Sequence, residues 1–332
     1  MTPTLNRVST TLRTLAAAVA VAAATSAAAA PEEVTYLLPA PATLPAFAPW
    51  MIAQQQGYYA DENIRISFVS AKGGVDVAKQ LGAGNALVGG AIGDTPIIVR
   101  ANGVPVKAVA VLGAGSLTQI AVHEAGPIRS LKDMKGRTLT VLSYTDTTYY
   151  ALLGSLKLAG LGKNDVSAQA AGPTGVWQLF AANKSEGMAA VPEWVINAEE
   201  AGAKVRLFNA SETFPSMAQA ILASDETIKT KPELVRRLVR ATLRGMQDII
   251  KDPKAAAAVY AKAVPAFAGK EALVERIFSM YRERVYGKQK TLGEMDPKRL
   301  DAVQRFYVSE GIVAKPAPLE ELYTNQFIGV TR

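Results

Sequence analysis

Two acidic residues hold matching places in this chain and could either bind a ligand or stabilise a helix. Asp94 follows a short run of small apolar residues, and Glu193 follows a similar run ninety-nine residues later. A helix-forming stretch comes after each acid and ends at a glycine, Gly103 in the first case and Gly202 in the second. The equal spacing predicts two similar strand–turn–helix units, each with an acid at the start of its helix.

Two roles are open to each acid. A carboxylate at a helix N-terminus accepts backbone N–H bonds and complements the helix dipole, which contributes about 1 kcal/mol. The same position lies beyond the carboxyl end of a strand, where open α/β sheets bind their ligands. Asp146, which precedes another expected helix, has the same alternatives. The candidate ligand contacts at the two matching junctions are Asp94, Thr95, Glu193 and Trp194.

The residue types that most enzymes use for covalent chemistry are scarce. The chain has no cysteine and a single histidine, His123, so the usual nucleophile–base sets and thiolate metal sites are missing. A structurally satisfied histidine is the favoured interpretation of His123. The adjacent Tyr149 and Tyr150 do not suffice for a metal site, because such a site recruits further ligands. We therefore expect a protein that is not an enzyme and that uses neither a metal nor a cofactor.

The first thirty residues have the pattern of a secretory signal peptide. Arg7 and Arg13 precede an apolar run from Leu15 to Ala24, and small residues follow up to Ala30. Cleavage is expected near residues 28–30. No later segment has eighteen uninterrupted apolar residues, so no membrane span is expected after removal of the signal. The net charge of +7 becomes +5 without the two arginines, which is too diffuse to indicate nucleic-acid binding.

Strands alternate with helices through the first two thirds of the chain. Apolar or alternating runs at 34–38, 64–69, 106–112, 138–142 and 166–170 predict strands, and helical patterns separate them. After Asp225 the chain is predicted to be helical to its end. Phe47 and Trp50 share a helix face and are favoured as core residues over pocket residues, whereas Tyr144 lies in a loop at a strand end. This order indicates α/β architecture with mostly parallel sheets.

The chain resembles bacterial solute-binding proteins of ABC importers for nitrate, sulfonates, taurine and thiamine precursors. The resemblance runs from about Val34 to Phe327 and rests on the order and spacing of several segments. These segments are Ala53 to Gly57-Tyr58-Tyr59 with Glu62 and Ile64-Arg65-Ile66, Gly73-Gly74, Leu131 to Thr138, Leu158-Ala159-Gly160-Leu161, Pro232 to Val235 and Asp252 to Ala256.

The resemblance implies a type II periplasmic-binding-protein fold with two lobes, two crossover strands near 117–122 and 217–223, and a helical C-terminal tail. Residues 31–118 and 222–332 would form lobe 1, and residues 119–221 would form lobe 2. It also implies a periplasmic monomer that closes its lobes around a small-molecule ligand and then docks on an ABC permease of the inner membrane.

The matching family positions suggest which residues contact the ligand. Thr147 is the better candidate beside Asp146, because its family position lies at a helix N-terminus that suits anions. The chain departs from the family at Asn85-Ala86, where an aspartate is common, in the loop from Tyr144 to Thr148, and at Val191 to Trp194, where Trp-Glu-Pro is common. The predicted ligand-binding residues are Thr43, Phe47, Gly73, Gly74, Asp94, Thr95, Gln119, Tyr144, Thr145, Thr147, Glu193 and Trp194.

The charge of the ligand stays open at this point. A sulfonate or carboxylate fits two helix N-termini, but Asp94, Asp146 and Glu193 oppose an anion unless they cap helices or face away. An aromatic or heterocyclic solute fits Tyr144, Trp194 and the acids better. Two other functions also remain open, namely an enzyme of the same fold acting on a pyrimidine-type precursor and a periplasmic ligand sensor.

Overall fold

The computed structural model describes residues 30–144, 146–210 and 212–329. The predicted signal peptide and the candidate contact Thr145 lie outside the described residues. Among the residues that are described, no helix is both long and apolar enough to cross a membrane.

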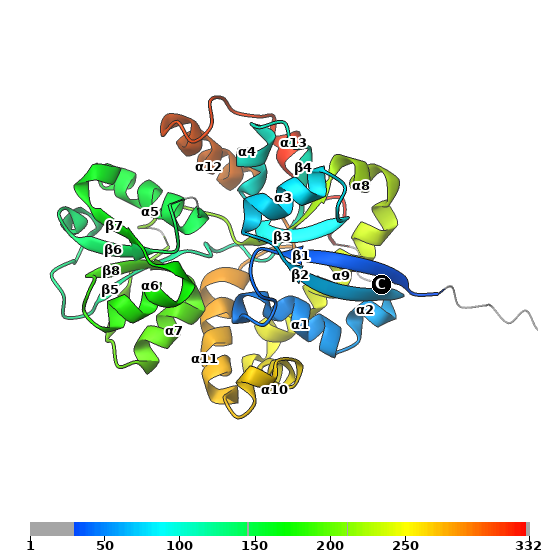
Figure 1. Ribbon diagram of the computed structural model, residues 1–332, viewed down its shortest axis with the longest axis horizontal. Helices are drawn as coiled ribbons and strands as arrows, with labels where there is room; N and C mark the ends of the chain where they lie inside the picture. Colours follow the sequence, from blue (N-terminus) through cyan, green and yellow to red (C-terminus); the bar gives the residue numbers. More distant parts are fainter. Residues whose placement is uncertain (1–29, 145, 211, 330–332) are drawn as a thin grey trace, which may run out of the picture. The chain divides into compact units, whose positions relative to one another are not determined.

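Two five-stranded sheets organise the chain (Figure 1). In spatial order, the first sheet contains β2 (Ile64–Ser70), β1 (Glu32–Leu38), β3 (Val88–Ile92), β10 (Gln219–Ser224) and β4 (Val106–Val111). The second contains β7 (Ser167–Ala170), β6 (Thr138–Val141), β8 (Gly187–Ala190), β5 (Gln119–His123) and β9 (Val205–Leu207). We call the first sheet with its helices lobe 1 and the second lobe 2.

The two sheets have the same topology. In lobe 1, β1 pairs in parallel with β2 and β3, while β10 pairs antiparallel with β3 and β4. In lobe 2, β6 pairs in parallel with β7 and β8, while β5 pairs antiparallel with β8 and β9. The antiparallel pairs are those of β5 and β10, the strands that the chain enters as it passes from one lobe to the other. The predicted two-lobe α/β fold is confirmed.

The exact domain limits stay a prediction. β5 begins at Gln119, where lobe 2 was predicted to start, and β10 begins at Gln219, three residues before the predicted return to lobe 1 at residue 222. Sequence patterning finds each strand, but the position at which a chain leaves one body for another depends on pairing between distant residues.

Helices cover both sheets, and their limits follow local signals. Asp252 caps the helix that starts at Pro253 by accepting the Ala255 N–H, as predicted. The α-helices are α1 (Ala48–Gln55), α2 (Tyr58–Asp61), α3 (Gly74–Gly82), α4 (Thr95–Arg100), α5 (Thr147–Leu158), α6 (Gly172–Ala181), α7 (Pro192–Glu200), α8 (Asp225–Thr230), α9 (Pro232–Lys251), α10 (Pro253–Ala263), α11 (Glu271–Tyr281), α12 (Pro297–Ser309) and α13 (Leu319–Leu322). Short 3-10 turns occur at Pro45–Phe47, Leu131–Met134, Lys163–Asp165 and Pro265–Phe267, and a π-helical turn at Arg282–Tyr286.

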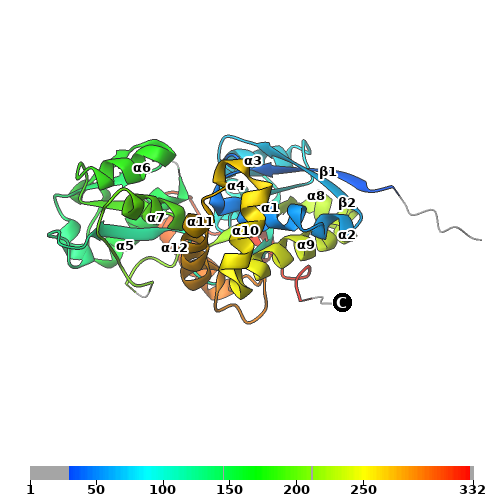
Figure 2. The ribbon, with the colours of Figure 1, turned by 90° about the horizontal axis from the view of Figure 1, so that it is seen from below.

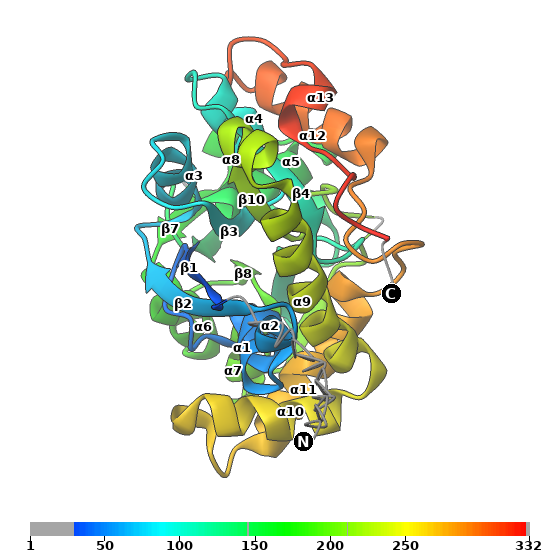
Figure 3. The ribbon, with the colours of Figure 1, turned by 90° about the vertical axis from the view of Figure 1, so that its right-hand side faces the viewer.

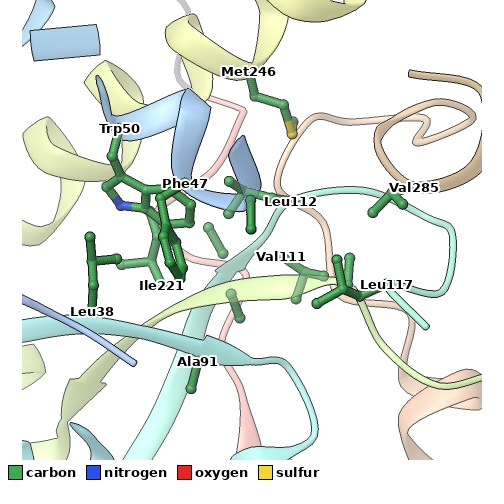
Figure 4. Packing of buried hydrophobic residues seen from close by; sticks show 14 of the residues in the cluster. Leu38, Phe47, Trp50, Ala91, Val111, Leu112, Leu117, Ile221, Met246 and Val285 are labelled. Carbon is green, nitrogen blue, oxygen red and sulfur yellow. The ribbon is translucent and has the colours of Figure 1, made fainter. Parts of the chain in front are cut away.

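The core of lobe 1 lies between its sheet and α1, with α9 running alongside α1 and α2 (Figure 3). Phe47 and Trp50 are buried in the same hydrophobic cluster as Leu38 and Ile221 (Figure 4). Their rings meet edge to face at 6.1 Å, a favourable aromatic arrangement. The core position favoured for both residues from their helical spacing is confirmed.

Two helices of the C-terminal tail touch both lobes. α11 packs against α10 and α9 of lobe 1 and against α7 of lobe 2 (Figure 2), where Arg276 pairs with Glu199 at 2.8 Å. α12 carries Tyr307, whose ring meets that of Tyr150 in α5, and Glu310 at its end accepts a bond from Lys157 at 2.9 Å. The tail therefore braces the lobes at two separate places.

Candidate functional site

The lobe 1 junction is the turn between β3 and α4, and it buries Asp94. The residue stands at the N-cap position of α4, but its side chain makes no capping bond. Its Oδ2 atom instead accepts the hydroxyl of Tyr307 at 2.9 Å. The side chain is fully buried, and the second oxygen, Oδ1, has no hydrogen-bond partner.

Burial controls the protonation of Asp94. Its pKa is raised to about 7, mainly by desolvation and to a smaller extent by the nearby Asp146 carboxylate. The bond from Tyr307 and the charge of Arg299 act in the opposite direction. The pKa of the Tyr307 hydroxyl is itself far above its usual value because of burial, so this hydroxyl keeps its proton and is the donor. Near neutral pH, Asp94 is therefore present in both its neutral and its charged form.

The lobe 2 junction is the turn between β8 and α7, and it buries Glu193 in the first helical turn. Its Oε2 atom accepts the hydroxyl of Tyr281 in α11 at 2.6 Å. Burial raises the pKa of Glu193 to about 7, whereas Tyr281 and the backbone N–H of Ala46 favour the charged form. Because Ala46 and α11 pack in lobe 1 and Glu193 belongs to lobe 2, this carboxyl group joins the two lobes.

The predicted repeat is confirmed, since both acids stand at a strand–helix junction of the same topology. Capping was one of the two roles open to Asp94, and its side chain makes no capping hydrogen bond. Its carboxylate turns instead to a tyrosine hydroxyl, contributed by a helix more than two hundred residues away in sequence. Asp146 is the acid that does cap: its Oδ1 accepts the Thr148 N–H at 2.8 Å and also the Thr148 hydroxyl.

A row of four tyrosines leads from the surface of lobe 2 to Asp94. Tyr144 is 54% exposed, and its ring lies edge to face with that of Tyr149 at 5.5 Å. The Tyr149 and Tyr150 rings are 6.1 Å apart, and the Tyr150 ring lies 5.7 Å from that of Tyr307. Aromatic faces of this kind stack on planar ligands. The exposure of Tyr144 agrees with its place among the predicted ligand contacts. Contact with a ligand stays a prediction.

The predicted glycine turn lies against the lobe 1 junction. Gly73 is the N-cap of α3 with φ of 95°, a conformation that favours glycine. A Cβ atom on Gly74 would lie 2.9 Å from the Cβ of Ala91 and 3.5 Å from Oγ1 of Thr95. The structure therefore brings Gly74 and Thr95 together, and it does so through close packing of α3 on β3.

The other predicted contacts are scattered. Thr43 is exposed in the loop after β1, and its carbonyl accepts the Tyr260 hydroxyl at 2.6 Å. Thr147 is the half-buried first residue of α5, and Trp194 is buried in α7. Phe47 lies in the core. Their roles toward a ligand stay predictions.

Gln119 is buried at the start of β5, and both ends of its amide are bonded. Its Nε2 donates to the Ser116 carbonyl at 2.8 Å, and its Oε1 accepts from Arg284 at 3.3 Å. This pairing within the protein leaves Gln119 less suited to a ligand than the sequence suggested.

The crossover segments contain functional candidates that sequence reasoning missed. Arg299 of α12 donates to the Pro215 carbonyl at 2.9 Å, to Ser116 Oγ at 2.8 Å, and also to the Ala114 and Ser216 carbonyls. It thus ties the two crossings together. Ser216 Oγ and Gln219 Oε1 are buried without a partner. A signal for the last two did exist, because Ser116 and Gln119 recur one hundred residues later as Ser216 and Gln219.

His123 has a structural place. Its ring stacks on Phe180 with centroids 4.0 Å apart, and Nε2 lies 3.1 Å from the Ser185 carbonyl. The interpretation as a satisfied structural histidine is confirmed. In the described part of the chain, no group of three or more His, Cys, Asp or Glu residues could hold a metal ion.

A pocket of about 520 Å³ lies away from the strand–helix junctions, between α2, α9 and the C-terminal segment. Its charged side chains are already paired, since Arg240 donates to Glu62 at 2.6 Å and Arg244 donates to Asp61 at 2.9 Å. With these charges neutralised inside the protein, the pocket offers little polar specificity.

Comparison with known proteins agrees with this architecture. The family model described as "NMT1/THI5 like" matches residues 44–256. The chain belongs to this family. It is 26% identical to the riboflavin-binding protein RibY of Chloroflexus aurantiacus over 289 residues, which is 85% of this chain and 82% of RibY.

Solved structures of other proteins have the same fold as this chain. The alkanesulfonate-binding protein SsuA from Xanthomonas axonopodis pv. citri, bound to MOPS, superposes with a TM-score of 0.70 at 18% identity, over 90% of this chain and all of SsuA. The desulfurization enzyme DSZB superposes with a TM-score of 0.57 at 15% identity, over 89% of this chain and 97% of DSZB. The predicted periplasmic-binding-protein fold is thereby confirmed, and it is a fold that an enzyme also uses.

Proposed function

We propose that this protein is the periplasmic solute-binding component of an ABC importer, which captures a small organic solute between its lobes and delivers it to an inner-membrane permease. Family membership, the matched topology of the lobes and the two crossings between them support this role. The signal-peptide pattern of the first thirty residues supports export. We expect a monomer, because the family uses both lobes of one chain to enclose its ligand.

We propose further that the solute is an uncharged aromatic heterocycle. The observation that carries this choice is the pairing at the two junctions, where each acid is buried against a tyrosine. An anion would meet the buried carboxyl group of Asp94, and Arg299, whose charge acts on Asp94, has its donors bonded to the crossover segments. The tyrosine row offers aromatic surface. The likeness to a riboflavin-binding protein points the same way, whereas the likeness to SsuA favours a sulfonate.

A thermal-shift panel tests the proposal. Riboflavin, thymine, benzoate, taurine and nitrate would each be added to purified protein at neutral pH. A ligand at one hundred times its Kd stabilises the folded state by about 2.7 kcal/mol, which gives a clear rise in Tm. We expect riboflavin or thymine to raise Tm. A rise with taurine or nitrate alone would overturn the heterocycle, and no rise with any of the five would count against the importer role.

The enzyme alternative is favoured only by the fold shared with DSZB. We expect a ligand that raises Tm to be recovered unchanged after prolonged incubation with the protein, as judged by chromatography and mass spectrometry. A chemically altered product would establish an enzyme instead. A sensor would be recognised by binding of the ligand-bound protein to a receptor rather than to permease-containing vesicles.

A further inference from the structure

Among the buried side-chain atoms of the described residues that lack a hydrogen-bond partner, three belong to residues at the adjoining ends of β3 and β10. They are Oδ1 of Asp94, Oγ of Ser216 and Oε1 of Gln219. Leaving a buried acceptor unsatisfied costs roughly 1–3 kcal/mol, so native proteins rarely do so without a reason. A functional role of the unpaired group is one such reason.

The three residues lie at or just beyond the ends of two neighbouring strands, β3 and β10. β10 runs antiparallel to β3, with Gln219 opposite Ile92. The N–H of Gly93 donates to the Ala218 carbonyl at 2.9 Å, so the pairing continues past the end of β3 toward Asp94. Asp94 and the Ser216–Gln219 segment are therefore neighbours along the backbone, where lobe 1 meets the crossover.

The repeat supplies an internal comparison. Ser116 and Gln119 hold the equivalent places at the start of β5, yet both are bonded within the protein: Ser116 Oγ accepts from Arg299, and the Gln119 amide bonds at both ends. The unpaired state of Ser216 and Gln219 is therefore not a general consequence of the motif. It is confined to the copy that lies beside Asp94.

The unpaired oxygen of the charged Asp94 carboxylate and the amide oxygen of Gln219 can only accept a hydrogen bond. The Ser216 hydroxyl can accept or donate one. The tyrosine row ends at the same place, because Tyr307 bonds the other oxygen of Asp94. Resting on the function proposed above, we propose that Asp94, Ser216 and Gln219 receive an N–H-bearing edge of the heterocyclic ligand when the lobes close.

Calorimetric titration with riboflavin and 3-methylriboflavin tests this proposal. The two probes differ in the ring N–H that the methyl group replaces. A site built to bond an N–H rejects an analogue that lacks it, because its buried acceptor stays unpaired. We expect the wild-type protein to bind 3-methylriboflavin at least about tenfold more weakly than riboflavin. Equal affinities would overturn the assignment of the edge while leaving the proposed function intact.

Variants locate the contact independently of the analogue. Gln219→Met keeps length and removes the amide, and we expect riboflavin to bind it about tenfold more weakly. Ser216→Ala is expected to weaken binding a few-fold. Ser185→Ala is the matched control, since Ser185 Oγ is equally buried and unpaired but lies before β8, at the opposite end of a lobe 2 strand.

The outcomes separate the two proposals. Wild-type binding of riboflavin or thymine reports on the function, and the absence of binding by both would overturn the two proposals together. Riboflavin affinity within twofold of wild type in Gln219→Met, with the Tm of the variant also unchanged, would overturn the role of Gln219. The wild-type comparison of the two flavins needs no variant, so it decides the proposal even if Gln219→Met fails to fold.

Discussion

The two strand–helix junctions each bury an acid almost completely at the start of the helix, at the N-cap of α4 for Asp94 and in the first turn of α7 for Glu193, but the groups around the two acids differ. Glu193 at the lobe 2 junction meets Tyr281, the Ala46 N–H and the neighbouring Tyr260 and Tyr286 rings. Asp94 at the lobe 1 junction meets one tyrosine hydroxyl and keeps an unpaired oxygen.

This difference assigns different tasks to the two copies. The carboxyl group of Glu193, which bonds Tyr281 and the Ala46 N–H of the other lobe, acts as a tie between lobes. The carboxyl group of Asp94 keeps an unpaired oxygen, and Ser216 and Gln219 of the neighbouring segment also have unpaired atoms, so this junction is suited to bind a ligand. The fold needs the strand and the helix at both junctions. It does not require the same hydrogen-bond partners for the two acids, so these partners can differ between the two copies.

The largest expected effect comes from removing the tie. Glu193→Ala would leave the Tyr281 hydroxyl and the Ala46 N–H facing a cavity. We expect the free energy of unfolding to fall by about 4 kcal/mol, measured by urea denaturation. Glu199→Ala in the same helix is the control, since loss of its partly exposed pair with Arg276 should cost less than about 1 kcal/mol. Similar losses in the two variants would mean that Glu193 is not a tie.

A pH effect shared by both junctions comes next. Each carboxyl group has a pKa of about 7 in the folded protein, against ordinary values near 4 when the chain unfolds. Folding therefore takes up protons between about pH 4 and pH 7. This contribution to stability is complete below about pH 4 and is lost as the pH rises through 7.

We expect the free energy of unfolding to decline more in the wild type than in the double variant Asp94→Asn, Glu193→Gln as the pH rises from 4 to 7.5, by about 3 kcal/mol for each acid. Urea denaturation at several pH values measures this difference. Parallel pH profiles in the two proteins would show that the two acids are ionised throughout.

A smaller effect separates the two tyrosines. Tyr307→Phe leaves Asp94 without a side-chain donor, whereas Tyr281→Phe leaves Glu193 with the Ala46 N–H. We expect Tyr307→Phe to lower the free energy of unfolding by about 1 kcal/mol more than Tyr281→Phe at pH 8, where both acids are charged. At pH 5 the gap should close, because neutral carboxyl groups need their donors less. A gap of opposite sign at pH 8 would reverse the comparison.

The sequence predicted much of the fold because its signals are local. Glycines such as Gly103 and Gly202 end helices wherever they occur, and the Asp252-Pro253 pair starts one by its own chemistry. The equal spacing of Asp94 and Glu193 was enough to predict two matching units.

The partners of the two acids could not be predicted in the same way. Tyr281 lies 88 residues from Glu193 and Tyr307 lies 213 residues from Asp94, and neither tyrosine stands out from the other aromatic residues of its helix. Such contacts depend on how the tail packs across both lobes. The Ser216 and Gln219 pair was detectable from its repeat of Ser116 and Gln119, but its unpaired state is a property of packing alone.

The most direct test of the different tasks of the two junctions is the riboflavin affinity of Asp94→Asn and Glu193→Gln, measured by calorimetry at pH 7. Both changes keep the size of the side chain and one carbonyl oxygen. We expect Asp94→Asn to bind riboflavin at least about tenfold more weakly than wild type, and Glu193→Gln to remain within about threefold. A strong loss in Glu193→Gln together with unchanged binding in Asp94→Asn would contradict the account.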